Sequence, residues 1–486
     1  MGQNLPAGPL AVYLHFPFCL KPCPYCSFFK RPWSRSAHER YLQALLQEAE
    51  LWEKRFGRRV PASSLYFGGG TPSLLKGEEI LRLCECFDLK QRDRGTEAFY
   101  SMRNERTRGN DKQRWSSSGH DKGMYDSEFA GRLDFNQHAR NPDCSDGHAG
   151  KHDYSEVLLE VQSPFRRRDK RITCLGALSS KVADCDPVTR NALRITSFPE
   201  ITLEVNPIQI TPDFVKGLRT TPVNRLSIGV QSMRDEALGY LGRAHKAASI
   251  PERIRLLRDQ GYDNISLDLI YGLPGMDLDD LKRDLDAFVA LGPEHISCYL
   301  LTLDEDSELA RAIAEGKSPS LPDDESCALQ YELICQVLKK AGFIHYEISN
   351  FARPGFEGRH NLSYWHSSPY LALGTAASGW LPPKRYCNPA SLDEYYRLIE
   401  AGELMPGAET LSPAQSEADE IMMGLRLLEG IDLKNFETRH LHPFERGRER
   451  ELERLIELEL LERGDGRIRL SERALFISNA VIGELL

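Results

Sequence analysis

Residues 15–26 of this chain are His15-Phe16-Pro17-Phe18-Cys19-Leu20-Lys21-Pro22-Cys23-Pro24-Tyr25-Cys26, and their three cysteines follow the spacing C-x3-C-x2-C. Three thiolates this close together can bind three irons of a cubic [4Fe–4S] cluster, for which a full set of protein ligands would be four. An iron without a protein ligand is open to a small molecule. Zinc and disulfides are alternatives, but structural zinc usually takes four ligands, and the only nearby candidate for a fourth is His15. The spacing therefore favours an iron–sulfur centre that is catalytic or ligand-binding.

The composition is that of an ordinary globular protein. The chain has 486 residues, enough for two or three domains, and 27% of them are charged. The net charge of −9 gives no global basic field, so we expect no nucleic-acid partner and at most peripheral association with a membrane. The 12 cysteines are too sparse for a secreted disulfide scaffold, and no signal peptide or membrane span is visible. These features predict a cytoplasmic protein.

Short apolar runs alternate with amphipathic stretches along much of the chain. Strands are predicted at Leu10–Phe16, Ser64–Phe67, Glu200–Val205, Arg225–Val230, Ile265–Ile270 and Ile296–Leu301, and helices at Tyr41–Phe56, Ile80–Phe87 and Ile250–Gln260. Such alternation indicates an α/β fold with a parallel sheet and helices outside it. Because polar and Gly residues gather where these strands end, we expect an incomplete (β/α) barrel with its site at the C-terminal strand ends.

A polar block interrupts the alternation. From Phe99 to Glu156, Leu133 is the only Leu, Ile or Val, so this segment cannot bury enough apolar surface to offset the entropy lost on ordering. We therefore expect residues 91–197 to be a disordered insertion. It separates residues 1–90, the first part of the barrel with the cysteine loop, from residues 198–380, the rest of the barrel.

Residues 381–486 have a different character and are predicted to form an accessory domain. Helices are expected at Ser416–Leu428, Arg448–Leu461 and Ser471–Leu486, with a short strand at Arg467–Leu470. Helices combined with a small hairpin suggest a winged-helix-like module. Because this module is rich in glutamate, we favour a packing or partner role over DNA binding.

Three features beyond the cysteines are suited to ligand binding. The turn Gly68-Gly69-Gly70-Thr71 lets a ligand approach the backbone, and its N–H groups could face a carboxylate or a ribose. Glu204 and Asp268 lie on apolar strands, where a charge is costly unless it is paired or used. Arg243 could pair with a carboxylate through two hydrogen bonds. For each residue alone, a tight turn or a structural ion pair is an equally good interpretation.

Taken together, these residues resemble the radical S-adenosylmethionine superfamily, and within it the oxygen-independent coproporphyrinogen III oxidase group. The matching runs are Tyr13-Leu14-His15-x-Pro17-Phe18-Cys19-x3-Cys23-x-Tyr25-Cys26, Gly68-Gly69-Gly70-Thr71-Pro72-Ser73, Glu204-Val205-Asn206-Pro207, Ser227-Ile228-Gly229-Val230-Gln231-Ser232, Gly242-Arg243-Ala244-His245 and Asp268-Leu269-Ile270-Tyr271-Gly272-Leu273-Pro274-Gly275.

The resemblance implies an incomplete barrel with a small C-terminal domain. It also implies that Cys19, Cys23 and Cys26 hold a [4Fe–4S] cluster whose fourth iron takes the amino and carboxylate groups of S-adenosylmethionine. The residues implied to line the pocket of that cofactor are Tyr13, Tyr25, Gly69, Gly70, Thr71, Glu204, Gln231, Arg243 and Asp268.

Two branches of this group differ at two places. True coproporphyrinogen oxidases carry a further Cys two residues after the third cluster Cys, where this chain has Phe28. HemW-type haem chaperones lack that Cys and carry an H-N-x-x-Y-W motif, which here is His360-Asn361-Leu362-Ser363-Tyr364-Trp365. An imidazole can ligate haem iron and aromatic rings can pack on the macrocycle. We therefore expect His360, Tyr364 and Trp365 to contact haem, although a structural role for this histidine is the alternative.

The resemblance thus favours a haem chaperone that passes haem to an unidentified acceptor protein and receives electrons from a donor such as a flavodoxin or a ferredoxin. The alternative function is oxidative decarboxylation of coproporphyrinogen III, against which Phe28 argues. A cluster protein with another radical substrate is a third possibility. One departure from the family is Thr375-Ala376-Ala377-Ser378-Gly379, which follows Leu373-Gly374 where the family usually has a histidine-containing run.

Overall fold

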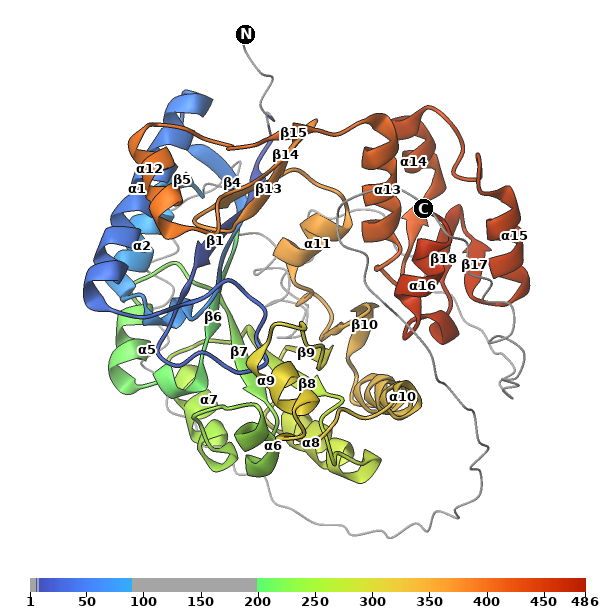
Figure 1. The fold of residues 1–486 in the computed structure, drawn as a ribbon, viewed down its shortest axis with the longest axis horizontal. Helices are drawn as coiled ribbons and strands as arrows, with labels where there is room; N and C mark the ends of the chain where they lie inside the picture. Colours follow the sequence, from blue (N-terminus) through green and yellow to red (C-terminus); the bar gives the residue numbers. More distant parts are fainter. Residues whose placement is uncertain (1–5, 7, 90–198) are drawn as a thin grey trace, which may run out of the picture. The chain divides into compact units, whose positions relative to one another are not determined.

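The computed structural model describes residue 6, residues 8–89 and residues 199–486 (Figure 1). The insertion predicted at residues 91–197 lies outside these described residues. All six strands predicted from the alternation are present, with shifts of a few residues at their ends. They are β1 (Leu10–Phe16), β4 (Val60–Gly69), β6 (Glu200–Val205), β7 (Arg225–Gln231), β8 (Ile265–Tyr271) and β9 (His295–Leu300).

These strands form the parallel centre of one large mixed sheet. In spatial order its parallel strands are β12 (Tyr370–Leu373), β1, β4, β6, β7, β8 and β9. On the β9 side, β11 (Asn350–Ala352) and β10 (Ile344–Glu347) are added antiparallel. On the β12 side, the added strands are β13 (Ser378–Leu381), β14 (Lys384–Cys387) and β15 (Glu409–Thr410). The sheet therefore continues past residue 380, where we expected the barrel to end.

Helices cover the outer face of this sheet, as Figure 1 shows for α1, α2, α5, α7 and α8. Those between the parallel strands are α1 (Arg35–Phe56), α2 (Gly77–Glu85), α5 (Pro212–Leu218), α6 (Asp235–Tyr240), α7 (Ile250–Asp259) and α8 (Leu278–Ala290). The remaining barrel helices are α9 (Glu308–Ala314), α10 (Asp324–Lys340), α11 (Arg359–Trp365) and α12 (Leu392–Glu400). Short strands β2 (Phe18–Cys19), β3 (Arg31–Pro32) and β5 (Phe87–Asp88) complete the N-terminal part.

Helix α1 illustrates how the sequence sets these elements. The Ser34 side chain accepts a hydrogen bond from the amide of Ala37 and so caps the first turn. Gly57 ends the helix in the left-handed conformation, at a φ of 66°. Between these caps, Tyr41 and Trp52 are fully buried against the sheet. Amphipathic spacing and two capping residues are therefore sufficient to explain this helix.

The C-terminal residues form a small separate layer of helices and strands. Its elements are α13 (Pro413–Gly424), β16 (Ile431–Asp432), α14 (Leu433–His440), α15 (Glu449–Glu457), β17 (Leu461–Gly464), β18 (Arg467–Leu470) and α16 (Ser478–Gly483), with the three strands in the order β16-β18-β17. The predicted strand is confirmed, but the single helix predicted at Ser471–Leu486 is wrong. Residues 472–474 form a 3-10 turn, because the Ser471 amide donates to the Leu460 carbonyl and so extends the pairing of β17 with β18 up to this point.

Within the residues that the structure describes, no helix combines the length and the apolar composition that crossing a bilayer requires.

Gly374, at the end of β12, provides a stability test of this architecture. Its φ is 98°, and a Cβ atom there would lie 2.5 Å from the Tyr41 hydroxyl and 2.7 Å from the His15 carbonyl oxygen. Gly261 also has a positive φ, of 83°, but no atom lies within 4 Å of its Cβ position. We expect Gly374→Ala to lower the free energy of unfolding by about 3 kcal/mol and Gly261→Ala by about 1 kcal/mol. Equal losses in chemical denaturation would contradict the packing described.

Candidate functional site

The parallel strands carry polar side chains on the inner face of the barrel. Tyr13 on β1 lies opposite Tyr66 on β4, and Glu204 on β6 lies opposite Ser227 on β7. Residues paired across neighbouring strands point to the same face. The Tyr66 hydroxyl donates to Glu204 over 2.9 Å, and the Ser227 hydroxyl donates to Asp268 over 3.2 Å. Both predicted acids therefore lie on the inner face.

The cysteine loop leaves this face at the end of β1. Cys19 is buried at the end of β2, Cys23 and Cys26 are half-buried, and none of the three thiols forms a disulfide. The Thr71 hydroxyl lies 3.4 Å from the Cys19 sulfur, and the Arg243 guanidinium lies 3.5 Å from the Cys23 sulfur. Burial raises the pKa of Cys19, whereas the Thr71 hydrogen bond lowers it. A positive charge and hydroxyl donors near sulfur suit thiolates that carry iron.

The donor set of the cysteine loop consists of three free thiols. Among the described residues, no three His, Cys, Asp or Glu side chains converge closely enough to enclose one ion. The thiols are nevertheless near neighbours, since Cys23 and Cys26 both raise the pKa of Cys19 after the larger effect of burial. Three neighbouring thiolates are the ligand set that an iron–sulfur cluster with one open iron would take.

The glycine turn after β4 is used differently from the expectation. The Gly69 amide donates to Glu204 over 3.1 Å, and the Gly70 amide donates to the carbonyl of Phe16 over 2.7 Å. Both N–H groups are thus engaged within the chain, and the placement of Gly69 and Gly70 in a cofactor pocket stays a prediction. Gly69 has a φ of 111°, and a Cβ there would lie 2.5 Å from the His15 ring, so glycine is required by packing.

A second group of predicted residues gathers on the other side of the cysteine loop. Arg243 donates to the carbonyl of Gly229 over 2.7 Å, and the Tyr25 hydroxyl interacts with Arg243 and the Cys23 thiol. Gln231 follows β7 with a φ of 71°. Within the described part of the chain, Gln231 Oε1 and Arg243 Nε are buried without a hydrogen-bond partner. An unpaired buried acceptor beside an unpaired buried donor fits a polar ligand such as an amino acid group.

The H-N-x-x-Y-W motif lies on α11, and its histidine is not available to a ligand. His360 is 1% exposed; its Nδ1 is hydrogen-bonded to the Ser64 hydroxyl at 2.9 Å and its Nε2 to the Tyr364 hydroxyl at 2.6 Å. Burial lowers the pKa of His360 to about 3, so the ring is neutral. Ligation of iron by this histidine would require one bond to break and the ring to leave its site. The geometry agrees with the structural alternative.

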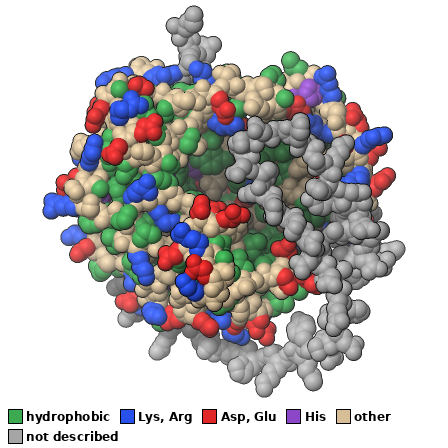
Figure 2. Space-filling view, viewed as in Figure 1, with side chains coloured by type: hydrophobic (Ala, Val, Ile, Leu, Met, Phe, Trp, Pro, Cys, Tyr) green, Lys and Arg blue, Asp and Glu red, His purple; other side chains and the backbone are tan. Residues whose placement is uncertain are grey.

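Tyr364 and Trp365 instead line a cavity of about 1250 Å³ between the barrel and the C-terminal layer. Its aromatic wall comes from Tyr13, Phe28, Phe29, Tyr364, Trp365, Tyr370 and Trp380, and further side chains come from Met422, Met423, Arg385, Arg439, His440, His442 and Arg446. Figure 2 shows a face that is hollowed near its centre, with hydrophobic side chains inside the hollow. This volume exceeds the usual range for small-molecule pockets, about 300–1,000 Å³, and suits a large planar ligand.

Carboxylates hold several of the polar side chains on the cavity wall. Arg385 donates to Asp419 over 3.2 Å, and the His440 Nε2 is hydrogen-bonded to Glu420 at 2.9 Å. The Arg439 guanidinium also pairs with Glu420. These pairs fix the polar groups at the rim of an otherwise aromatic cavity. Sequence reasoning missed this wall, because α13 and α14 are distant in sequence from the cysteine loop and show no motif.

Comparison with known proteins places these features in a family. A model of the radical SAM superfamily matches residues 145–317, and a model of the HemN C-terminal domain matches residues 411–477. A protein named heme chaperone HemW from Bacillus subtilis (strain 168) is 30% identical over 302 residues, which cover 62% of this chain and 79% of that protein. This chain belongs to the HemW family of radical SAM proteins.

Other relatives agree over longer spans. The heme chaperone HemW of Lactococcus lactis subsp. lactis (strain IL1403) is 26% identical over 478 residues, covering 98% of this chain and 97% of that protein. The solved structure of coproporphyrinogen III oxidase (HemN) from Escherichia coli matches with a TM-score of 0.63 and 19% identity, covering 98% of this chain and 90% of that one. The latter likeness concerns the fold alone. The superfamily match begins at residue 145, inside the predicted insertion and outside the described residues.

In this HemW-family chain, Phe28 follows the cysteine loop and also lines the large cavity. Its side chain is 66% exposed, and it lines the large cavity two residues after Cys26. The position that would hold a fourth cysteine thus carries an apolar ring that faces the cavity. The structure offers no replacement thiol there, since the other free cysteines of the described residues do not line this cavity.

The inner-face acid Glu204 gives a pH test of the site. Burial raises its pKa to about 7, opposed by the hydrogen bond from Tyr66 and assisted by the charge of Asp268. The stability from this group is therefore fully present below about pH 4.5 and is lost as the pH rises through about 7. The free energy of unfolding of Glu204→Gln, measured relative to the parent by chemical denaturation, should rise by about 2–3 kcal/mol as the pH is raised from about 5 to about 8. A pH-independent difference would contradict the burial of an ionisable group.

Proposed function

We propose that this protein is a haem chaperone that binds haem in the large cavity and transfers it to an acceptor protein. The observation that carries the proposal is that Tyr364 and Trp365 of the H-N-x-x-Y-W motif line a cavity of about 1250 Å³ together with the C-terminal layer. Haem is an apolar macrocycle with two carboxylate side chains. Aromatic walls bury the ring, and the cavity-lining Arg446 suits a carboxylate.

The iron of the bound haem would be met by side chains other than His360. Met422 and Met423 both line the cavity from α13. The thioether of methionine is an established haem ligand. His360 is a positioning residue in this proposal, since its Nε2 holds the Tyr364 hydroxyl at 2.6 Å.

A variant of His360 distinguishes positioning of Tyr364 from ligation of the haem iron. We expect His360→Ala to weaken haem binding several-fold, because Tyr364 loses its partner, while the absorption spectrum of bound haem keeps its shape. A changed spectrum in His360→Ala, with the axial ligation altered, would instead show that His360 ligates the iron. Binding titration and optical spectra of the two proteins at saturating haem provide both readings.

A [4Fe–4S] cluster held by Cys19, Cys23 and Cys26, with S-adenosylmethionine at its open iron, is part of the proposal. When bound, these groups would supply one-electron chemistry. The chain's own contribution is to hold the thiolates with Thr71 and Arg243, and to offer Gln231 Oε1 and Arg243 Nε as unpaired partners for a polar ligand. Glu204 and Asp268 are engaged with Tyr66, Gly69 and Ser227.

The experiment that tests the function pairs two assays on one reconstituted sample. Haem titration should give saturable binding, and bound haem should move to an apo-acceptor. Conversion of coproporphyrinogen III under anaerobic reducing conditions should be absent, because Phe28 occupies the position of the further cysteine. Turnover of coproporphyrinogen without haem binding would overturn the proposal in favour of the oxidase.

A further inference from the structure

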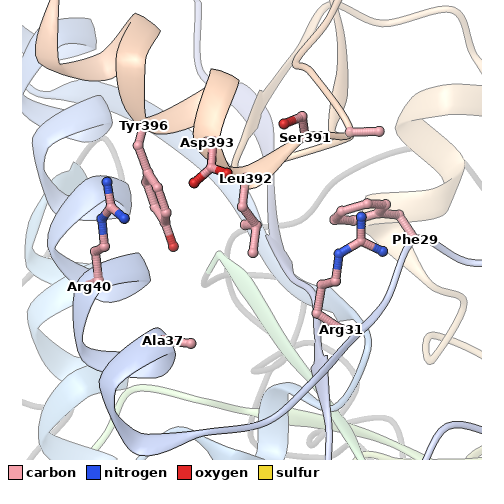
Figure 3. Close-up of a pocket in the computed structure, with 9 residues that line it drawn as sticks. Phe29, Arg31, Ala37, Arg40, Ser391, Leu392, Asp393 and Tyr396 are labelled. Atoms are coloured by element: carbon pink, nitrogen blue, oxygen red, sulfur yellow. The ribbon is translucent and has the colours of Figure 1, made fainter.

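A basic pocket of about 560 Å³ lies beside the cysteine loop, on the outside of the barrel. It is lined by Phe29 and Arg31 near β3, by Arg40 on α1, and by Asp393 and Tyr396 on α12. Figure 3 shows the side chains of Arg31 and Arg40 on opposite sides of this pocket, next to the rings of Phe29 and Tyr396. The site proposed for haem does not use these arginines.

Both guanidinium groups are held by aromatic rings and keep their charge available. The Arg31 group lies 4.5 Å from the centre of the Phe29 ring, and the Arg40 group lies 4.0 Å from that of Tyr396. Among the described residues, Arg31 forms no ion pair, and the ion pair recorded for Arg40 is a long one, 3.9 Å, to Glu400. Asp393 is the acidic side chain in the lining. The pocket is therefore a local positive site on a chain whose net charge is −9.

The basic character extends along the segment that contains the cysteines. Between Leu20 and Tyr41 the chain carries Lys21, Lys30, Arg31, Arg35 and Arg40, and its acid there is Glu39, which pairs with Arg35 at 2.9 Å. The same segment carries an exposed aromatic side chain, since Trp33, two residues after Arg31, is 38% exposed. A few cations around an exposed aromatic residue are a usual composition for a protein-binding surface.

The pocket is also joined directly to the first cluster cysteine. Strand β3 pairs with β2, so that Arg31 lies opposite Phe18 and Pro32 opposite Cys19. The Trp33 amide donates to the Cys19 carbonyl over 3.0 Å. A molecule bound at this surface would therefore be separated from Cys19 by a single strand. Such proximity suits a partner that exchanges electrons with a group held by Cys19.

We propose that this pocket docks a small acidic protein that donates single electrons to the cluster; the proposal rests on the proposed [4Fe–4S] centre. One electron leaves the donor, for example a flavin hydroquinone that becomes the semiquinone, and the oxidised cluster gains it; no bond of this chain forms or breaks. Opposite charge accelerates the encounter and makes it sensitive to salt. The haem acceptor is the alternative partner for the same surface.

The test uses the reconstituted full chain and reduced flavodoxin as the donor. In R31E/R40E, the second-order rate of cluster reduction at low salt should fall at least tenfold, and its dependence on salt should flatten. Binding of oxidised flavodoxin, measured by calorimetry, should weaken by a similar factor. R31Q/R40Q, which removes charge without reversing it, should give a smaller loss in both measurements.

The matched control is K282E/K317E, which changes the charge by the same amount on exposed lysines away from the pocket. It should keep the rate within twofold of the parent. Reduction by dithionite should be equal in all variants. An equal loss of reduction rate in the control would overturn the proposal that the pocket binds the electron donor. Loss of haem transfer with an unchanged rate of cluster reduction would overturn it too. Absence of a cluster in the parent would instead refute the proposed function on which it rests.

Discussion

Replacement of Cys23 by serine is expected to abolish the brown chromophore of the reconstituted chain and to remove its iron and sulfide. A [4Fe–4S] cluster with three protein thiolates cannot tolerate the loss of one, because a serine hydroxyl is a far poorer ligand for iron at neutral pH. The Cys23 sulfur lies 3.5 Å from the Arg243 guanidinium, which donates a hydrogen bond to it. The measurement is the iron and sulfide content with the visible absorption spectrum.

Cys387→Ser is the matched control for this variant. Cys387 is an exposed free thiol on β14, and it lies outside the cysteine loop. It should keep the full iron content and spectrum. If Cys23→Ser also kept them, the cluster assignment would fail, whereas loss in both variants would point to a general effect of removing thiols.

Replacement of Trp365 by alanine is expected to weaken haem binding about tenfold or more. Burying an aromatic ring of this size against a ligand contributes about 1.5–3 kcal/mol, and each 1.4 kcal/mol corresponds to about a tenfold change in affinity. Trp365 lines the cavity next to Tyr364, and the Arg426 guanidinium lies 5.0 Å from its ring. A haem titration followed by absorbance gives the dissociation constants.

Trp33→Ala is the control, because this tryptophan does not line the cavity. Its haem affinity should stay within about twofold of the parent. Circular dichroism of both variants checks that the fold is retained, since Trp33 is exposed and Trp365 is only partly buried. If Trp365→Ala bound haem as tightly as the parent, the cavity would not be the haem site.

Much of the barrel could be predicted from the sequence because its signals are local. Apolar runs such as Leu10–Phe16 and Glu200–Val205 became strands with the predicted bounds. Their period and length suffice, since a parallel strand buried on both faces is recognisable from a few residues. By contrast, β12 to β15 were not predicted. Such short strands are stabilised by their partners, as when β12 pairs with β1 on one side and with β13 on the other, and their own residues carry little signal.

The candidate site could likewise be predicted only in part. The cysteine spacing and the acids on apolar strands indicated chemistry from residue type alone, and the structure brings Glu204 and Asp268 to one inner face. The use of the Gly69 amide by Glu204, and the burial of His360 between Ser64 and Tyr364, could not be predicted. Both depend on contacts between residues more than 100 positions apart in the sequence.

The sequence by itself determined the family, the barrel and the loop that carries the three cysteines, because spacing and periodicity are properties of neighbouring residues. Only the tertiary structure decided which members of the H-N-x-x-Y-W motif line the cavity. One helical turn separates His360 from Tyr364, yet packing buries the first against β4 and turns the second towards the cavity. The physical reason is that a side chain's availability depends on what covers it, and the covering residues come from distant parts of the chain.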